Sequence, residues 1–167
     1  MPKSDQGIHS DRYLVVPRTL IFLFDTNSRV LLLKGADDKR LWAGLYNGIG
    51  GHIERGEDIY EAACRELREE TGLEDVDLHY SAQITVDVTA QSGVMIFVFK
   101  GISQQTSLTE SSEGVLAWVP LDEIGGVPLV EDLPLLIPLV AAHKPSAAVL
   151  FGKYSYDDDG NLITQFR

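Results

Sequence analysis

The sequence predicts an α+β fold or an α/β/α layering, built from antiparallel hairpins and helices. Three observations favour it. The β-type runs come in pairs joined by short turns, as in hairpins; two longer helical stretches are separated by strands; and strands and helices do not alternate as in a series of βαβ units. With 167 residues, of which 44% are hydrophobic and 23% charged, residues 1–167 are expected to form one domain with its own hydrophobic core.

The first part of the chain is predicted to be a polar, flexible leader followed by a hairpin. Residues 1–11 form the leader, and residues 13–24 form the first strand. Pro17 inside this run marks an edge, a bulge or a strand start, because proline cannot donate to a ladder. A turn leads back into residues 30–34 as the second strand. After a loop, residues 45–51 are a short strand with three glycines in its last four positions, where the backbone can bend sharply or approach a ligand closely.

The middle of the chain is predicted to contain a helix and a second hairpin. The helix opens at Glu57 or Asp58 and ends at residues 71–72, because Gly72 is a good C-cap. Residues 76–88 and 94–100 are β-rich runs joined by a turn. A polar loop then leads to a further strand at residues 114–120.

The last part of the chain is predicted to contain an apolar helix and a third hairpin. Residues 121–124 form a short helical turn, and residues 133–143 form the helix. Pro138 is expected to kink or shorten this helix, because it removes a backbone donor from its interior. Residues 148–156 and 162–166 flank a polar turn and read as the final hairpin.

Charge and composition exclude several classes of function. The formal net charge of −11 argues against a nucleic-acid duplex as the partner, because duplex binding depends on basic patches. No apolar run reaches the roughly 18 residues of a membrane helix, and residues 1–11 contain no apolar signal core. We therefore expect a cytoplasmic protein without a membrane partner. The single cysteine, Cys64, allows no internal disulfide, and we place it on the outer side of the central helix.

The central helix carries glutamates on the side that should be buried. At about 100° per residue, Glu66 and Glu70 fall in the middle of the face that carries the apolar residues, and Glu69 falls at its edge. Buried carboxylates are paired, protonated or bound to metal, because a lone buried charge is costly. Carboxylates at spacings of three and four, preceded by glycine carbonyls, can complete the oxygen shell of a hard cation. The pattern therefore indicates a divalent-cation site.

An ordinary surface helix is the alternative interpretation of the same residues. Glu–Arg pairs three or four residues apart would each stabilise such a helix by about 0.2–0.5 kcal/mol. That interpretation explains the charges one by one, but not why two glutamates share the apolar face. In the metal-site interpretation, Arg65 orients a glutamate rather than contacting substrate, and Glu57 is its partner.

The same stretch resembles the signature of the Nudix hydrolases. Gly51, five residues, Glu57, seven residues and then the run RELREETGL at residues 65–73 fill every fixed position of that pattern. The resemblance implies an α/β/α sandwich around a mixed, largely antiparallel sheet, and the Mg²⁺-dependent cleavage of a diphosphate linked to another moiety, with Mn²⁺ as a possible substitute. It also implies a catalytic set that comprises Glu57, Arg65, Glu66, Glu69 and Glu70.

The resemblance further implies the ligands of the cation. These are the backbone carbonyl of Gly50 and the side chains of Glu66, Glu69, Glu70 and Glu113, with Glu110 as the alternative to Glu113. One of the three helical glutamates would deprotonate the attacking water. Glu113 or Glu110 would complete the site from a later loop.

The segments that flank the signature resemble the branch of the family that hydrolyses oxidised purine nucleoside triphosphates. The run Asn-Gly-Ile-Gly-Gly at residues 47–51 matches, with Tyr46 where that branch has Trp, and the similarity continues to the final hairpin. It implies that the substrate is bound by Asn47, Gly51, Glu131 and Asp132. An Asn side chain offers a donor and an acceptor, and a carboxylate accepts from purine N–H groups. The aromatic residue that precedes the acidic pair in that branch is replaced here by Leu129-Val130.

The sequence thus predicts Mg²⁺-dependent hydrolysis of a nucleoside triphosphate, of the 8-oxo-dGTP type, to the monophosphate and pyrophosphate. One alternative is a pyrophosphatase that acts on ADP-ribose or another nucleoside diphosphate derivative. A second is a non-catalytic module that senses nucleotides. In each case the expected partner is a small nucleotide, and the protein is expected to be a monomer or a homodimer.

Overall fold

The computed structural model describes residues 2–7, 11–36, 42–105, 108 and 114–167. These residues form one eight-stranded sheet in the order β3-β2-β1-β5-β4-β7-β8, with β6 paired to β2. The strands are β1 (Leu14–Phe24), β2 (Arg29–Gly35), β3 (Tyr46–Asn47), β4 (Leu78–Asp87), β5 (Ser92–Ile102), β6 (Gly114–Pro120), β7 (Leu150–Tyr156) and β8 (Leu162–Phe166). The helices are α1 (Ile59–Thr71) and α2 (Leu133–Ala142), with short 3-10 helices at Lys3–Gln6 and Ile124–Gly126.

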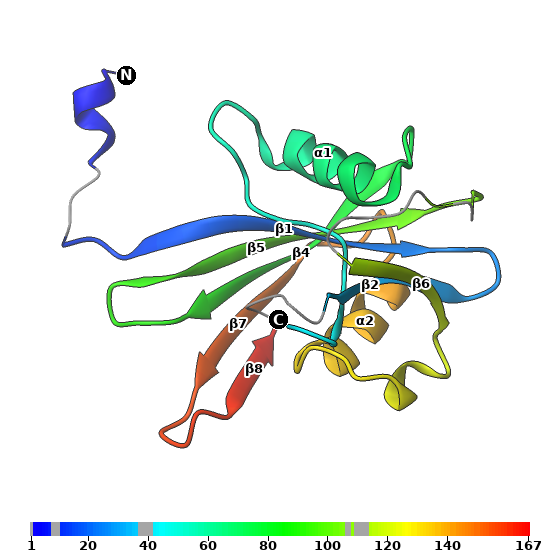
Figure 1. Cartoon of the computed structure of the whole chain (residues 1–167). Coiled ribbons are helices and arrows are strands. Elements are labelled where there is room, and N and C mark those ends of the chain that lie inside the picture. The colour runs from blue at the N-terminus through cyan, green and yellow to red at the C-terminus, as the bar shows by residue number, and fades with distance from the viewer. Residues whose placement is uncertain (1, 8–10, 37–41, 106–107, 109–113) are drawn as a thin grey trace.

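The sheet is mixed and largely antiparallel, as predicted. β1 pairs with β5 and β4 pairs with β7 in parallel, and the other strand pairs are antiparallel. The three predicted hairpins are β1–β2, β4–β5 and β7–β8. α1 and α2 lie on opposite sides of the sheet (Figure 1), so the predicted α/β/α layering is confirmed.

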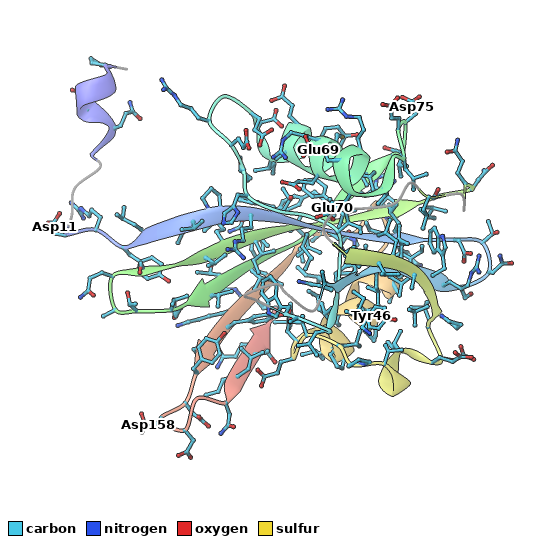
Figure 2. The ribbon with its side chains drawn as sticks, in the orientation of Figure 1. Asp11, Tyr46, Glu69, Glu70, Asp75 and Asp158 are labelled. Atoms are coloured by element: carbon cyan, nitrogen blue, oxygen red, sulfur yellow. The ribbon has the colours of Figure 1, made fainter. Side chains whose placement is uncertain are left out.

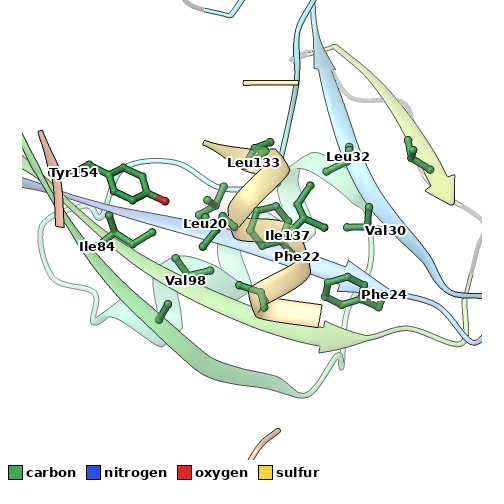
Figure 3. Close-up of a cluster of buried hydrophobic side chains, with 14 residues drawn as sticks. Leu20, Phe22, Phe24, Val30, Leu32, Ile84, Val98, Leu133, Ile137 and Tyr154 are labelled. Carbon is green, nitrogen blue, oxygen red and sulfur yellow. The ribbon is translucent and has the colours of Figure 1, made fainter. Parts of the chain in front are cut away.

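Each face of the sheet has its own hydrophobic core, because side chains alternate between the two faces along a strand. The core on the α1 side includes Ile21, Leu23, Leu31, Ile49, Ala63, Leu67 and Phe99. Figure 3 shows the core on the α2 side, which includes Leu20, Phe22, Phe24, Val30, Leu32, Ile84, Val98, Leu133, Ile137 and Tyr154. The two helices are therefore held by separate sets of apolar contacts.

α1 begins and ends at strong local signals. Asp58 is the N-cap, and its carboxylate accepts from the backbone N–H groups of Tyr60 at 2.8 Å and Glu61 at 2.9 Å. The Glu61 carboxylate accepts in turn from the Asp58 backbone N–H at 2.8 Å, which completes a capping box. Gly72 ends the helix in the left-handed conformation, with φ 72°. The predicted limits of this helix are confirmed.

β1 runs through Pro17 without a bulge, which differs from one of the predicted roles of this residue. Pro17 lies opposite Met95 in an unbroken parallel register with β5. Its carbonyl accepts from the backbone N–H of Ile53 at 3.3 Å. Because the N and C=O of one strand residue face the same side, the missing N–H of Pro17 faces the loop at Ile53 rather than β5. The parallel ladder therefore loses no hydrogen bond.

The predicted strand at residues 45–51 is shorter than expected. Only Tyr46–Asn47 forms β3, and Ile49 continues as an isolated bridge to Ile21 of β1. Gly50, which follows this bridge, has φ 142°, outside the β-region of L-residues. Residues 46–51 therefore pair first with β2, through β3, and then with β1, on the edge of β1 that does not pair with β5.

The second helix passes through its internal proline. α2 extends from Leu133 to Ala142, with Pro134 in its first turn and Pro138 in its interior, so Pro138 does not end it. Within the described residues, no helix is long and apolar enough to cross a membrane.

Candidate active site

The segment at residues 49–51 lies against β1 and is shaped by glycine. The backbone N–H groups of Ile21 and Thr19 donate to the carbonyls of Ile49 and Gly51 at 2.6 and 2.9 Å. A Cβ atom at Gly50 would overlap the backbone carbonyl of Thr19, so only glycine fits there. The Gly50 carbonyl lies between these two bonds, and no described residue donates to it. It is therefore available to a ligand.

Two glutamates of α1 contact this segment. Glu70 is buried between α1 and the sheet, with 7% of its surface exposed, and its Oε2 accepts from the Gly50 N–H at 3.3 Å. The Glu66 carboxylate lies so close to Gly51 that a Cβ atom there would overlap it. Glu69 lies further out on the helix (Figure 2), with 54% of its side chain exposed. This order matches the prediction that Glu66 and Glu70 face inward and Glu69 lies at the edge.

Arg65 holds these carboxylates in place. It makes a two-point contact with Glu57, through Nη2–Oε1 at 2.8 Å and Nε–Oε2 at 3.0 Å. Its Nη1 contacts Glu66 Oε1 at 2.9 Å and Glu69 Oε2 at 3.2 Å. The predicted contact between Glu57 and Arg65 is present, and Arg65 does orient glutamates.

The electrostatics of this contact favour the charged forms of Glu57 and Arg65. The hydrogen bond from Arg65, followed by one from the Glu54 backbone N–H, lowers the pKa of Glu57 to about 2. Hydrogen bonds to Glu57 and Glu66 raise the pKa of Arg65 above its ordinary value. One guanidinium therefore faces the carboxyl groups of Glu57, Glu66 and Glu69, so acidic groups outnumber basic groups in this cluster, and a bound cation would offset that imbalance.

The carboxylates are not gathered into a ready-made metal site. Among the described residues, no three His, Cys, Asp or Glu side chains are grouped closely enough to hold a metal ion. Glu66 and Glu69 contact Arg65 instead, and Glu70 contacts the Gly50 amide. The donor chemistry does fit a hard cation, because carboxylate and backbone carbonyl oxygens are the ligands that Mg²⁺ takes. Glu113 and its alternative Glu110 lie outside the described residues.

Backbone pairing brings two of the segments predicted to bind the base together at the edge of the sheet. β3 runs beside residues 128–130, since Tyr46 donates its N–H to the Pro128 carbonyl at 2.8 Å and accepts from the Val130 N–H at 3.0 Å. This pairing places Asn47 beside the segment that leads into Glu131 and Asp132. The Asn47 side-chain oxygen accepts from the Gly48 N–H at 2.8 Å, while its NH₂ group has no partner among the described residues. Glu131 is exposed and Asp132 is half-buried.

The segment at residues 47–51 connects the two sets of side chains. Asn47 lies at one end, and the contacts with Glu66 and Glu70 lie at the other. An extended chain of this length spans about 14 Å at most. A ligand along this segment would therefore reach the carboxylates with one end and Asn47 with the other.

Sequence reasoning missed two contributions to this region. His52 accepts from Arg65 Nη2 through its carbonyl at 3.0 Å, and its ring accepts from Arg18 Nε at 3.2 Å. No periodicity or motif indicated either bond. Cys64 was predicted to be a surface or semi-buried thiol on the outer side of α1. It is half-buried and packs against the α1-side core, because the apolar contact surface of the helix is wider than its central stripe.

A family model supplies the deciding observation. The NUDIX domain model matches residues 15–140, which include the whole signature, the glycine segment and α1. This chain is a Nudix hydrolase. The enzyme class predicted from the signature, a hydrolase of phosphoric anhydrides, is confirmed, and members of the family generally use divalent cations.

Individual relatives refine this assignment. The Nudix hydrolase is 31% identical over 137 residues to the oxidized purine nucleoside triphosphate hydrolase of Mus musculus, covering 81% of this chain and 84% of the relative. It is 34% identical over 143 residues to the NAD-capped RNA hydrolase NudC of Pseudomonas aeruginosa, covering 85% of this chain and 49% of the relative. Its fold is similar to the crystal structure of a MutT protein from Bacillus halodurans, with a TM-score of 0.74, 26% identity, and coverage of 92% and 97%. The predicted similarity to the oxidised-purine branch is thus confirmed.

Replacing Gly51 by Ala is expected to impair hydrolysis more than folding. The new Cβ would push away the Glu66 carboxylate, which is the flexible end of a side chain, and the φ of Gly51 is not in the left-handed region. We expect kcat/KM to fall by about 10- to 100-fold, as for a misplaced catalytic group, while the free energy of unfolding changes by less than about 1 kcal/mol. Steady-state kinetics and urea unfolding measure the two effects.

Gly125→Ala is the matched control for this substitution. Nothing lies within 4 Å of a Cβ atom built at Gly125, so both quantities should remain at the wild-type level. A Gly51→Ala enzyme with full activity would show that the position of Glu66 has no bearing on hydrolysis.

Proposed function

We propose that this Nudix hydrolase converts a nucleoside triphosphate with an oxidised purine base, of the 8-oxo-dGTP type, to the monophosphate and pyrophosphate. The observation that carries the proposal is the five-residue segment 47–51, which joins the carboxylates of α1 to Asn47 and the Glu131-Asp132 pair. A nucleotide matches both ends of this segment. Its phosphate chain binds cations, which the carboxylates could hold, and its base has a polar edge, which Asn47 and the acidic pair could contact. The name of the mouse relative supports the choice of base.

The residues of the α1 side supply the chemistry in this proposal. Mg²⁺, or Mn²⁺ in its place, would be held by the Gly50 carbonyl, Glu66, Glu69 and Glu70, with Glu113 as a further ligand. The bound cation would neutralise the charge that develops on the phosphate oxygens. A water molecule attacks phosphorus, the bond to the pyrophosphate oxygen breaks, and one glutamate accepts the proton of the water. Arg65 fixes the directions of the Glu66 and Glu69 carboxylates through its Nη1 contacts.

Asn47, Glu131 and Asp132 choose the substrate in this proposal. The NH₂ group of Asn47, which has no partner among the described residues, can donate to a base oxygen or ring nitrogen, and Asp132 and Glu131 accept from base N–H groups. Such contacts discriminate strongly, because a base without the matching group leaves a polar side chain unpaired. Gly51 lets the substrate approach the backbone beside Glu66.

A nucleoside diphosphate derivative, such as ADP-ribose or NAD, is the second candidate substrate. The similarity to NudC covers 85% of this chain, and Leu129 and Val130 occupy the place where the oxidised-purine branch has an aromatic residue. ADP-ribose and NAD-type dinucleotides share the diphosphate with the first candidate but present adenine. They would use the same carboxylates and place a different group against Asn47.

A substrate panel with Mg²⁺ tests the proposal. It contains 8-oxo-dGTP, dGTP, dATP, dCTP, ADP-ribose and NAD, and the products are identified by mass. We expect 8-oxo-dGTP to have the highest kcat/KM, with pyrophosphate as the product. Higher kcat/KM on ADP-ribose or NAD, with two monophosphates as products, would replace the first candidate by the second.

A further inference from the structure

The last strand of the sheet has an outer edge to which no described strand is paired. β8 is the end strand in the order β3-β2-β1-β5-β4-β7-β8, and Figure 1 shows it beside β7. Among the described residues, no backbone group outside β7 bonds to β8. Such an edge presents a row of backbone donors and acceptors to which another strand can pair.

The register of β7 and β8 shows which backbone groups lie on this outer edge. The Arg167 N–H donates to the Phe151 carbonyl at 3.0 Å, and the Arg167 carbonyl accepts from the Phe151 N–H at 3.0 Å. The backbone groups of Arg167 therefore face β7, and so do those of Gln165 and Ile163, because the direction alternates along an antiparallel strand. The residues in between point their N–H and C=O groups outward: Leu162, Thr164 and Phe166.

β8 lacks the features by which edge strands usually avoid pairing. Its sequence, LITQF, contains no proline and no charged residue, and its register with β7 has no bulge. Proline, charge and bulges are the common means of protecting an edge. Ile163 is moreover 42% exposed on this strand. Both the backbone and the side chains of β8 therefore suit a contact with a further strand.

We propose that β8 is a dimerisation strand, which pairs with β8 of a second copy of this chain in antiparallel orientation around a two-fold axis at Thr164. In this register Thr164 lies opposite its own copy, and Leu162 lies opposite the second copy's Phe166. These are the residues whose backbone groups point outward, so each opposing pair exchanges two backbone hydrogen bonds. A register shifted by two residues would leave Leu162 or Phe166 beyond the end of the other strand.

The side chains of β8 match one another in this register. On the face that packs against α2, Leu162 meets the second copy's Phe166, and both already lie beside the apolar core. On the other face, the Ile163 side chains of the two copies are diagonal neighbours across the axis, a separation at which cross-strand side chains still interact. Dimerisation therefore covers the exposed surface of Ile163.

The charges at the two ends of β8 are complementary. Arg167 would lie opposite the second copy's Asn161, next to the turn between β7 and β8, which carries three consecutive aspartates. Two-fold symmetry provides this contact twice. In a chain with a formal net charge of −11, most surfaces of two copies repel each other, and a region where opposite charges meet is favoured for self-association.

The proposed interface leaves the α1 site accessible. β8 lies at one end of the strand order, and β3, which leads into the glycine segment, lies at the other. The carboxylates of α1 therefore keep their access to substrate in the dimer. Association and hydrolysis can be tested separately, and the outcome for one does not depend on the other.

Sedimentation velocity of the wild type between about 1 and 300 µM tests the proposal first. An edge pair of five residues is a small interface, so we expect a weak dimer with a Kd of about 10–100 µM. Thr164→Pro removes an N–H that faces the second copy and none that β7 uses, and should raise Kd at least about tenfold. Thr164→Val is the matched control: it keeps the N–H and suits a strand, so it should dimerise as the wild type does.

A second variant tests the same interface without altering the backbone. Ile163→Lys places two positive charges beside each other across the axis, and we expect Kd to rise at least about tenfold. Ile102→Lys is its control, because Ile102 is 62% exposed on β5 and the substitution changes the net charge equally. This control should leave Kd unchanged. Thermal unfolding and kcat/KM of every variant show that each one is folded.

Amide hydrogen exchange identifies the strand that pairs. On raising the wild-type concentration from about 10 to 300 µM, the N–H groups of Thr164 and Phe166 should exchange more slowly, because they become bonded to the second copy. Those of Ile163 and Gln165 face β7 in both states and should not change. Slower exchange in the second pair alone would place the contact elsewhere and reject the proposal.

Two further outcomes would overturn the proposal. A wild-type protein that remains monomeric up to about 300 µM would show that β8 does not pair with itself. A dimer whose Kd is unchanged by both Thr164→Pro and Ile163→Lys would show that the copies associate through another surface. If Thr164→Pro is unfolded, Ile163→Lys decides the question alone, since its side chain is partly exposed and its backbone is unaltered.

Discussion

Replacing Glu69 by Gln is expected to reduce kcat for the preferred substrate by about 10²–10⁴-fold, the range for loss of a group that acts on the reacting atoms. The substitution keeps the size of the side chain and removes its charge. Stability should hardly change, because the side chain is 54% exposed and its contact with Arg65 at 3.2 Å lies at the surface, where ion pairs contribute about 0–1 kcal/mol. Steady-state kinetics with saturating Mg²⁺, together with urea unfolding, measure both effects.

Glu74→Gln is the matched control for Glu69→Gln. Glu74 is exposed just beyond the end of α1, so the same chemical change there tests whether any loss of negative charge near the helix is harmful. The control should retain wild-type activity. Full activity in Glu69→Gln would remove Glu69 from the proposed ligand set, and an unfolded Glu69→Gln protein would show that its role is structural.

Replacing Arg65 by Ala is expected to damage activity and folding together. Arg65 contacts Glu57, Glu66 and Glu69 and also donates to the His52 carbonyl at 3.0 Å. Its removal leaves several carboxylates facing one another without a positive charge among them. Because the guanidinium is 20% exposed, we expect a loss of about 1–3 kcal/mol in the free energy of unfolding, below the cost of breaking a fully buried pair. We also expect kcat to fall by about 100-fold or more, because Glu66 and Glu69 lose their fixed directions.

Arg65→Lys distinguishes the charge of Arg65 from its geometry. Lysine keeps the positive charge but lacks the planar fork that contacts both oxygens of Glu57. We expect Arg65→Lys to recover most of the stability and only part of kcat. Equal recovery of both quantities would show that charge alone is required, and an Arg65→Ala enzyme with wild-type kcat would show that Glu66 and Glu69 need no positioning.

Local signals explain which parts of the fold were predictable. The limits of α1 follow from Asp58, Glu61 and Gly72, all of which act on backbone groups within a few residues. The hairpins follow from turns between adjacent β-rich runs. The parallel pairs β1·β5 and β4·β7 join residues far apart in the chain. Packing on both faces of the sheet, and no local signal, determines which strands pair in this way. The place of Pro17 in β1 also depends on the tertiary structure, because its nitrogen faces the loop at Ile53 and not the parallel strand β5.

The sequence by itself determined the reaction class of this Nudix hydrolase. The helical period places Glu66 and Glu70 on the apolar face of α1. The signature at residues 51–73 indicates the reaction, the hydrolysis of phosphoric anhydrides. Both are properties of one continuous stretch, so spacing alone reveals them.

Only the tertiary structure decided which distant segments meet around that helix and at the edge of the sheet. The pairing of β3 with residues 128–130 places Asn47 beside the segment that leads into Asp132. Arg65 reaches the His52 carbonyl across the glycine segment. These contacts join residues that are distant in sequence, and their geometry depends on how both cores pack. The free energy of such a contact depends on the burial and the direction of its groups, and not on the residues that are adjacent in the chain.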